Sequence, residues 1–249
     1  MRPGFLTAAL LWAPVLVTAQ TVDEVVARHI TARGGMDAIT AIQSLKITRT
    51  IATGIGSNVQ VTVYKKRPNL FRAEQRLATP AAPLTARGVN ADAAWDMAPG
   101  GKITLRPDAA AAEARDLDGD FDGLLINWKA KGHAVSFDGR ESMPGGDALK
   151  LRVKTKGGVE RIIYLDAATY LDRRHTGTLT LPSGRRDVVI DFSNWQDVNG
   201  VKFPFDINED RKGGNAPEQS LVVYTEKIEA NVAIDDALFA TPKSGGEGD

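Results

Sequence analysis

The chain has no cysteine, only three histidines and no excess of charge of either sign. Without thiols it can form neither disulfides nor thiolate-ligated metal sites. His29, His133 and His175 lie far apart and none belongs to a His-Glu-x-x-His motif, so we expect no metal site. The formal net charge of +0 provides no long-range attraction to nucleic acid or to an anionic membrane.

Long apolar runs are also scarce, and the clearest one lies at the N-terminus. Residues 5–17 are mostly apolar, Arg2 precedes them, and Val17-Thr18-Ala19 ends the run with small residues. This is the pattern of a secretory signal peptide. The run is shorter than the roughly 20 residues that cross a bilayer. We therefore expect residues 1–19 to be a cleaved signal peptide and the mature protein to be periplasmic.

Helical signals are confined to two stretches. Apolar residues recur at helical spacing from Val22 to Ser44, with Gly34-Gly35 as an expected break. Thr21 and Glu24 have the spacing of a capping box. Residues 107–131 include an alanine-rich run, which predicts one or two short inserted helices.

Most of the remaining chain alternates between apolar and polar residues. Clear examples are residues 59–64, 149–154 and 201–208. In the strand around residues 159–165, Arg161 has the same parity as Ile163 and Leu165, so the alternation is less clean. Glycine-containing turns separate these runs, which predicts about nine or ten strands joined as an antiparallel meander.

The apolar face of such a sheet must be removed from water. The sheet can close into a barrel filled by side chains, split into a sandwich, or stay open beneath helices that enclose a ligand cavity. Alternation alone leaves these three outcomes open.

Several motifs resemble those of the LolA-like periplasmic lipoprotein carriers. Residues 63–72 read Val-Tyr-Lys-Lys-Arg-Pro-Asn-Leu-Phe-Arg, similar to a strand–turn–strand segment of that superfamily. Residues 200–205, Gly-Val-Lys-Phe-Pro-Phe, and 235–239, Asp-Asp-Ala-Leu-Phe, resemble later segments in the same order, whereas Ala91-Asp92 departs from the expected Asp-Gly turn. The resemblance implies a mainly β fold: a curved antiparallel sheet, or open half-barrel, with an N-terminal helix and short inserted helices as a lid.

The same resemblance implies a function. We expect a single domain over residues 20–242, with residues 243–249 as a flexible tail. It would be an exported, non-enzymatic binder or carrier of lipid, acyl chains or lipoprotein in the cell envelope, with envelope membrane proteins as further partners. The alternative is a sensory or structural interaction module with a filled core and a protein partner. We expect a monomer that needs no cofactor and binds no nucleic acid.

The candidate ligand-binding residues are apolar side chains on the predicted strands and inserted helices. Whether the aromatic ones line a cavity or simply fill the core is left open by the sequence. The candidates are Leu70, Phe71, Trp95, Leu124, Leu125, Trp128, Leu151, Val153, Ile190, Phe192, Phe203 and Phe205.

Charged motifs have mostly structural interpretations. Asp118, Asp120 and Asp122 copy the start of an EF-hand loop, but Lys129 occupies the twelfth position, where a bidentate glutamate is required. We interpret them as a solvated turn in which Asp122 caps a following helix. Residues 65–67 and 185–186 are basic runs, interpreted as solubilising or as contacts to an anionic lipid head group. The chain has no Gly-x-Ser-x-Gly elbow, so we expect no hydrolase activity.

Overall fold

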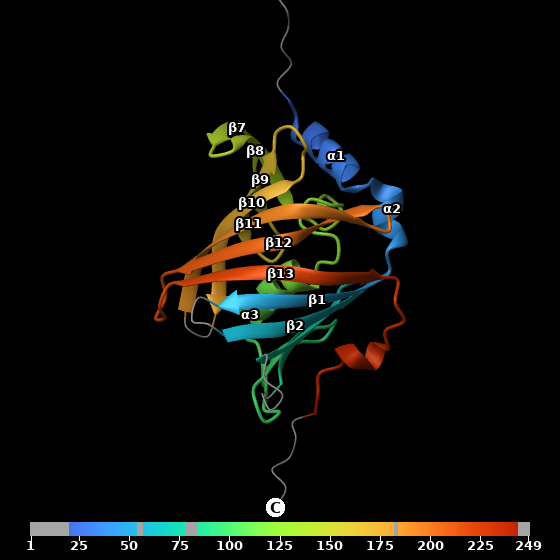
Figure 1. Cartoon of the computed structure of the whole chain (residues 1–249), viewed down its shortest axis with the longest axis vertical. Coiled ribbons are helices and arrows are strands. Elements are labelled where there is room, and N and C mark those ends of the chain that lie inside the picture. The colour runs from blue at the N-terminus through green and yellow to red at the C-terminus, as the bar shows by residue number, and fades with distance from the viewer. Residues whose placement is uncertain (1–19, 54–56, 78–83, 182–183, 244–249) are drawn as a thin grey trace, which may run out of the picture.

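The computed structural model describes residues 20–53, 57–77, 84–181 and 184–243. The expected signal peptide, residues 1–19, lies outside these ranges, as do residues 244–249 of the expected tail. The fold is mostly β: the described residues form one antiparallel sheet that is not closed into a barrel, accompanied by a few short helices (Figure 1).

Two helices precede the sheet, broken where the sequence predicts. Helix α1 spans Val22–Arg33 and α2 spans Met36–Ala41. The Thr21–Glu24 capping box is formed in both directions and satisfies main-chain donors at the start of α1. A side chain at Gly34 would place Cβ 2.0 Å from the main-chain oxygen of Gly200, so the break also lets α1 and α2 approach the turn before β12 (Val201–Lys212).

The described part of the sheet contains thirteen strands, more than alternation predicts. Alternation does not predict the short strands β4 to β6, which have too few residues to show a clear period. The turn between β4 and β5, at Ala91-Asp92, lies where the family resemblance places one. The strands are β1 (Ser44–Thr53), β2 (Ser57–Lys66), β3 (Leu70–Leu77), β4 (Thr85–Val89), β5 (Ala94–Met97), β6 (Ile103–Leu105), β7 (Ala134–Met143), β8 (Gly146–Lys154), β9 (Glu160–Asp166), β10 (Asp172–Leu181), β11 (Gly184–Val198), β12 (Val201–Lys212) and β13 (Gln219–Ala230).

Two meanders share this sheet. The strand order is β6-β5-β4-β3-β2-β1-β13-β12-β11-β10-β9-β8-β7, so every neighbouring pair is consecutive in sequence except β1 and β13. Those two pair from Leu45 opposite Ala230 to Thr53 opposite Leu221. The first and last strands of the chain therefore meet at the centre of the sheet and join its two halves.

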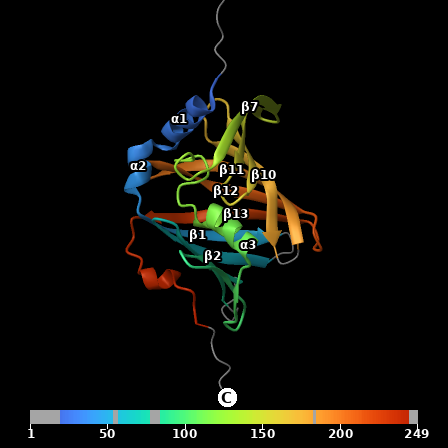
Figure 2. The same ribbon diagram turned by 180° about the vertical axis from the view of Figure 1, so that it is seen from behind.

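Residues 106–133, which we call the covering segment, pass over one face of the sheet, which we call the inner face. The segment contains helix α3 (Asp108–Ala114) and the π-helical turn η1 (Arg115–Gly119), followed by turns. Figures 1 and 2 place α3 on one side of the sheet, over its central strands. The expected helix after Asp122 is not formed: residues 124–132 are turns, and Asn127 has a φ of 53°.

The core lies between the inner face and these coverings, in two clusters. The first packs β1 to β4 against α2 and the covering segment; its larger members include Ile42, Leu45, Ile47, Val61, Val63 and Phe71. The second packs Val25 and Val26 of α1 and Leu125 of the covering segment against Leu149, Leu151, Ile163 and Leu165 of β8 and β9. Helices and covering segment thus complete a core that the sheet alone would leave exposed to water.

Candidate ligand-binding cavity

A cavity of about 740 Å³ lies between the inner face of the sheet and the covering segment. Its apolar lining comes from both sides: Leu117 and Leu124 from the segment, and Leu179, Leu181 and Ile190 from β10 and β11. Its charged lining consists of the carboxylates Asp96, Glu113, Asp116, Asp118, Asp120 and Glu209 and the guanidinium groups Arg87, Arg106, Arg161 and Arg211.

Most of these charges are paired with each other. Asp118 lies 3.2 Å from Arg87, Asp96 accepts two hydrogen bonds from Arg106, and Glu209 accepts one from Arg211 at 2.5 Å. Asp120 accepts from Lys131 at 2.6 Å, while Asp116 accepts from the Thr155 hydroxyl and the Gly157 main chain. Mutual pairing reduces the net field within the cavity and leaves its apolar walls available to an uncharged chain.

The covering segment is attached to the sheet by the basic run at residues 65–67. Arg67 donates to both carboxylate oxygens of Asp122 at 2.6 and 2.9 Å, and its guanidinium lies 4.4 Å from the Phe121 ring centroid. Lys65 donates to the main-chain oxygen of Asp120 at 2.5 Å. The solubilising interpretation is therefore wrong for Lys65 and Arg67, and so is the capping role of Asp122. Lys66 instead donates to Asp236 and to the main-chain oxygen of Ile234.

Lys65 and a second cation beneath the segment, Arg49, are partly removed from water. Burial lowers the pKa of Lys65 to about 8, although Asp120 and Asp118 oppose the shift. Burial, with Arg87 nearby, lowers the pKa of Arg49 to about 10. The Nε atom of Arg49 has no hydrogen-bond partner among the described residues. The segment is thus held by Lys65, Arg67 and Arg87, while Arg49 lies beneath without a carboxylate of its own in the described chain.

The second basic run is also structural. Arg186 is only 1% exposed and donates to Gln219 and to the main-chain oxygens of Arg211 and Pro217. It therefore ties β11 to the connection between β12 and β13. The solubilising interpretation is wrong for this residue as well, because the period-two pattern that places Val188 inward also places Arg186 inward.

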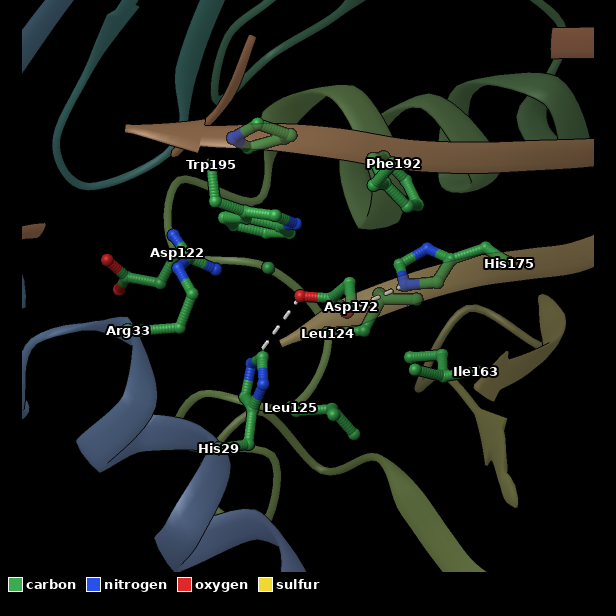
Figure 3. A pocket seen from close by; sticks show the side chains of 12 residues that line it. His29, Arg33, Asp122, Leu124, Leu125, Ile163, Asp172, His175, Phe192 and Trp195 are labelled. Carbon is green, nitrogen blue, oxygen red and sulfur yellow. Dashed lines mark hydrogen bonds and ion pairs between the residues drawn. The ribbon is translucent and has the colours of Figure 1, made fainter. Parts of the chain in front are cut away.

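A smaller pocket of about 150 Å³ adjoins the main cavity and shares Leu124 and His175 with it. Figure 3 shows His29 of α1 and His175 of β10 on either side of Asp172. His175 donates through Nε2 to Asp172 at 2.8 Å, and Nε2 of His29 lies 3.8 Å from the same carboxylate. His29 also donates through Nδ1 to the main-chain oxygen of Tyr170 at 2.9 Å. This cluster connects α1 to the sheet.

Burial and neighbouring charges shift the pKa values of Asp172 and His29 in opposite directions. Burial alone would raise the pKa of Asp172, but His29, His175 and Arg33 together lower it well below its ordinary range. For His29, burial outweighs the attraction of Asp172 and lowers the pKa. Near neutral pH we therefore expect a charged Asp172 beside a neutral His29.

The structure brings part of the candidate set to the cavities. Leu124 and Ile190 line the main cavity, and Leu124, Leu125 and Phe192 line the small pocket. Leu70 lines a separate cavity of about 450 Å³ beside the covering segment.

The other candidates are packed elsewhere. Residues within or against the two core clusters are Phe71, Trp128, Leu151, Val153, Phe203 and Phe205. Trp95 is fully buried on the outer face: it pairs with Gly88, opposite the face of Arg87 and Asp96, which line the cavity. On that face Arg72 donates to the main-chain oxygen of Leu238, in the turn η2 (Asp236–Phe239) that closes the chain over β3.

The charged lining of the cavity was missed at the level of sequence. Glu113, Arg87 and Arg161 belong to three separate elements, and only the fold brings them together. One signal was present: Arg161 shares its parity with Ile163 and Leu165, which places a cation on an apolar face.

An open, curved sheet with a covered inner cavity is the class of structure that the motifs imply, and comparison with solved structures confirms the LolA-like fold. The chain is similar to a putative outer membrane lipoprotein-sorting protein domain from Vibrio parahaemolyticus, at 12% identity over 88% of this chain and 95% of the other, with a TM-score of 0.57. It is similar to a LolA superfamily protein from Nitrosomonas europaea, at 12% identity over 89% and 98%, with a TM-score of 0.57.

A DUF1329 family protein from Desulfovibrio piger is comparable, at 14% identity over 89% of this chain and 98% of that one, with a TM-score of 0.58. No family model and no curated protein matches the sequence. At these identities the likeness establishes the fold and leaves the ligand open.

Two classes of feature are not found in the described ranges. None of their helices is both long and apolar enough to cross a membrane. No three His, Asp or Glu side chains there are grouped so as to hold a metal ion. Asp118, Asp120 and Asp122 each form an ion pair with a different lysine or arginine side chain.

Proposed function

We propose that this protein is a non-enzymatic binder of acyl chains in the cell envelope, and that the cavity beneath the covering segment holds the chain. The observation that carries the proposal is the cavity itself. Its volume of about 740 Å³ falls within the range of small-molecule sites, and leucine and isoleucine side chains line it from both sides. The fold shared with lipoprotein-sorting domains agrees with a ligand of this kind.

The attachment of the covering segment fits reversible access. Charged hydrogen bonds to Asp120 and Asp122, and apolar side chains such as Leu125 and Ile126 that pack in the core, hold the segment instead of the main-chain ladders of the sheet. Such contacts can break one at a time without unfolding β2 or β3. The binding of a chain would therefore require displacement of the segment alone.

The test is native mass spectrometry of the protein after export in its native host, under gentle, detergent-free conditions. We expect an added mass that extracts into organic solvent and matches an acyl lipid. The lipid-free protein should rebind monoacylglycerol. A protein that is lipid-free on isolation and stays so after incubation with lipids would refute the proposal and favour an interaction module with a filled core.

A matched pair of variants on α3 locates the site. Ala110 lines the cavity, so Ala110→Trp should fill it and reduce lipid binding. Ala109 is exposed on the same helix and lines a neighbouring cavity of about 550 Å³ instead, so Ala109→Trp should bind acyl chains as the wild type does. Equal binding by both variants would place the ligand elsewhere.

A further inference from the structure

Arg161 is a buried cation with an unused hydrogen-bond donor, and it lies between the main cavity and a second cavity of about 550 Å³. The residue lies on β9, is 4% exposed and lines the cavity. Its Nη1 donates to the main-chain oxygen of Glu160 at 2.9 Å, whereas Nη2 has no hydrogen-bond partner among the described residues. A buried donor without a partner is unfavourable, so a ligand that supplied an acceptor here would gain by it.

The position of this guanidinium is fixed by the strand beside it. Gly177 of β10 lies opposite Arg161 in the ladder. A Cβ atom at residue 177 would stand 2.7 Å from Nη1 and 2.8 Å from Cδ of Arg161. The same Cβ would stand 2.8 Å from the main-chain oxygen of Glu160, so glycine leaves room for both the arginine side chain and the β9 backbone.

The charge of Arg161 is already compensated. Glu113 of α3 lies 3.8 Å from Nη2, beyond hydrogen-bond distance, and its carboxylate accepts from the Thr180 main chain at 3.1 and 3.2 Å. Burial lowers the pKa of Arg161, while Glu113 and Glu209 both act to raise it. A ligand anion at Nη2 would be repelled by these two carboxylates, and the whole lining holds more carboxylates than guanidinium groups. The site therefore favours an uncharged acceptor.

We propose that Nη2 of Arg161 donates a hydrogen bond to the uncharged carbonyl oxygen of an ester- or amide-linked acyl chain. Arg161 would then select esterified chains over free fatty acids, with Gly177 as the residue that permits its position. This inference rests on the proposed function, since it concerns the same cavity.

The test compares three ligands of equal chain length by calorimetric titration of the lipid-free protein: a 1-monoacylglycerol, its 1-O-alkyl ether and the free fatty acid. The ether lacks only the carbonyl oxygen. One hydrogen bond to a charged donor predicts that the ester binds about tenfold more tightly than the ether. The fatty acid at pH 8 should bind more weakly than the ester.

Two variants tie the preference to the residue. Gly177→Ala displaces the guanidinium and should make ester and ether bind equally, at about the wild-type affinity for the ether. Arg161→Leu should behave in the same way. Arg140→Leu, at a half-exposed arginine on β7, should keep the tenfold preference. If Arg161→Leu fails to fold, the comparison of ester and ether binding by the wild type and by Gly177→Ala still tests the role of Arg161.

The outcomes separate the two proposals. Equal binding of ester and ether by the wild-type protein, or tighter binding of the fatty acid, would overturn the role of Arg161 while acyl-chain binding stands. Binding of none of the three ligands would overturn the proposed function together with this inference. A preference that survives Gly177→Ala would assign the carbonyl to another donor.

Discussion

At the scale of single residues, the covering segment is held by charges that are largely removed from water. The side chains of Arg67 and Asp122 are only 22% and 10% exposed, and their contact is bidentate. Arg67 also donates to the main-chain oxygens of Ile39 and Ile42, at the end of α2. One guanidinium thus connects β2, the helices and the covering segment, and its loss would leave Asp122 buried without its charged donor.

We expect Arg67→Ala to lower the free energy of unfolding by about 3 kcal/mol, as for a broken buried ion pair. Urea denaturation followed by circular dichroism would measure the loss. The control is Arg152→Ala, because Arg152 pairs with Asp138 at 3.0 Å but is 54% exposed. Exposed pairs contribute at most about 1 kcal/mol. Equal losses in the two variants would show that the Arg67 contact is no stronger than a surface pair.

The cluster of His29, Asp172 and His175 predicts how stability depends on pH. Because burial lowers the pKa of His29 in the folded protein, the unfolded chain binds more protons below pH 6.5, and stability falls on acidification. The lowered pKa of Asp172 acts in the same direction but only below about pH 4, where the unfolded carboxylate becomes protonated.

Stability should therefore decrease from pH 7.5 to pH 5.5, and His29→Gln should reduce that decrease. Urea midpoints at the two pH values would measure it. Burial also lowers the pKa of His133, so replacing His133 as well should reduce the decrease further. Stability that rose on acidification would mean that Asp172 overcomes burial and raises the pKa of His29.

At the scale of elements, the break between α1 and α2 shows how a local signal and a tertiary contact differ. Gly34 and Gly35 both have positive φ, of 126° and 86°. A Cβ at Gly34 would collide with the Gly200 main chain, whereas a Cβ at Gly35 would meet nothing within 4 Å. A side chain at Gly35 would therefore strain only the backbone conformation, whereas one at Gly34 would also disturb the packing of α1 against the sheet.

We expect Gly35→Ala to lower the free energy of unfolding by about 1–3 kcal/mol, because its φ of 86° and ψ of 162° lie in a region essentially restricted to glycine. Gly34→Ala should lower it by a further 1–3 kcal/mol or so, because α1 must move away from the turn before β12. Thermal and urea denaturation of both variants would compare them. An equal loss would show that only conformation matters at this break.

At the scale of the whole molecule, β13 holds the two meanders together. It pairs with β1 on one side and with β12 on the other. Removing it would expose main-chain donors and acceptors on both neighbours and open the core between the halves. The integrity of the sheet therefore depends on a strand near the C-terminus.

A chain that ends at Glu218 should accumulate only as insoluble protein, because β1 and β12 both become open edges. A chain that ends at Lys243 keeps every described helix and strand and should be soluble, with wild-type stability. Solubility after expression and gel filtration would compare them. A soluble, folded product of the shorter chain would show that the two meanders fold independently of β13.

Local patterns in the sequence were sufficient for several elements. Alternation identifies β2, β8 and β12, the Thr21–Glu24 spacing identifies the start of α1, and Gly34-Gly35 marks its end. Each depends on residues close together in the chain, whose side-chain directions follow from the helical or strand period. The short strands β4 to β6 could not be predicted in this way, because three to five residues provide too little alternation.

The sequence by itself determined the fold class and the antiparallel pairing of consecutive strands, because these follow from local periodicity, turn residues and the order of family-like motifs. The central pairing of β1 with β13, which lie far apart in the chain, does not follow from such local signals. Only the tertiary structure decided where the charges lie. The partners of Arg67, Arg161 and His29 are distant in the chain, and their selection depends on the β1–β13 pairing and on the path of residues 106–133. A basic run beside a turn has the same sequence pattern whether its side chains face water or contact Asp122. Which of the two occurs depends on burial, and burial is determined only by the complete fold.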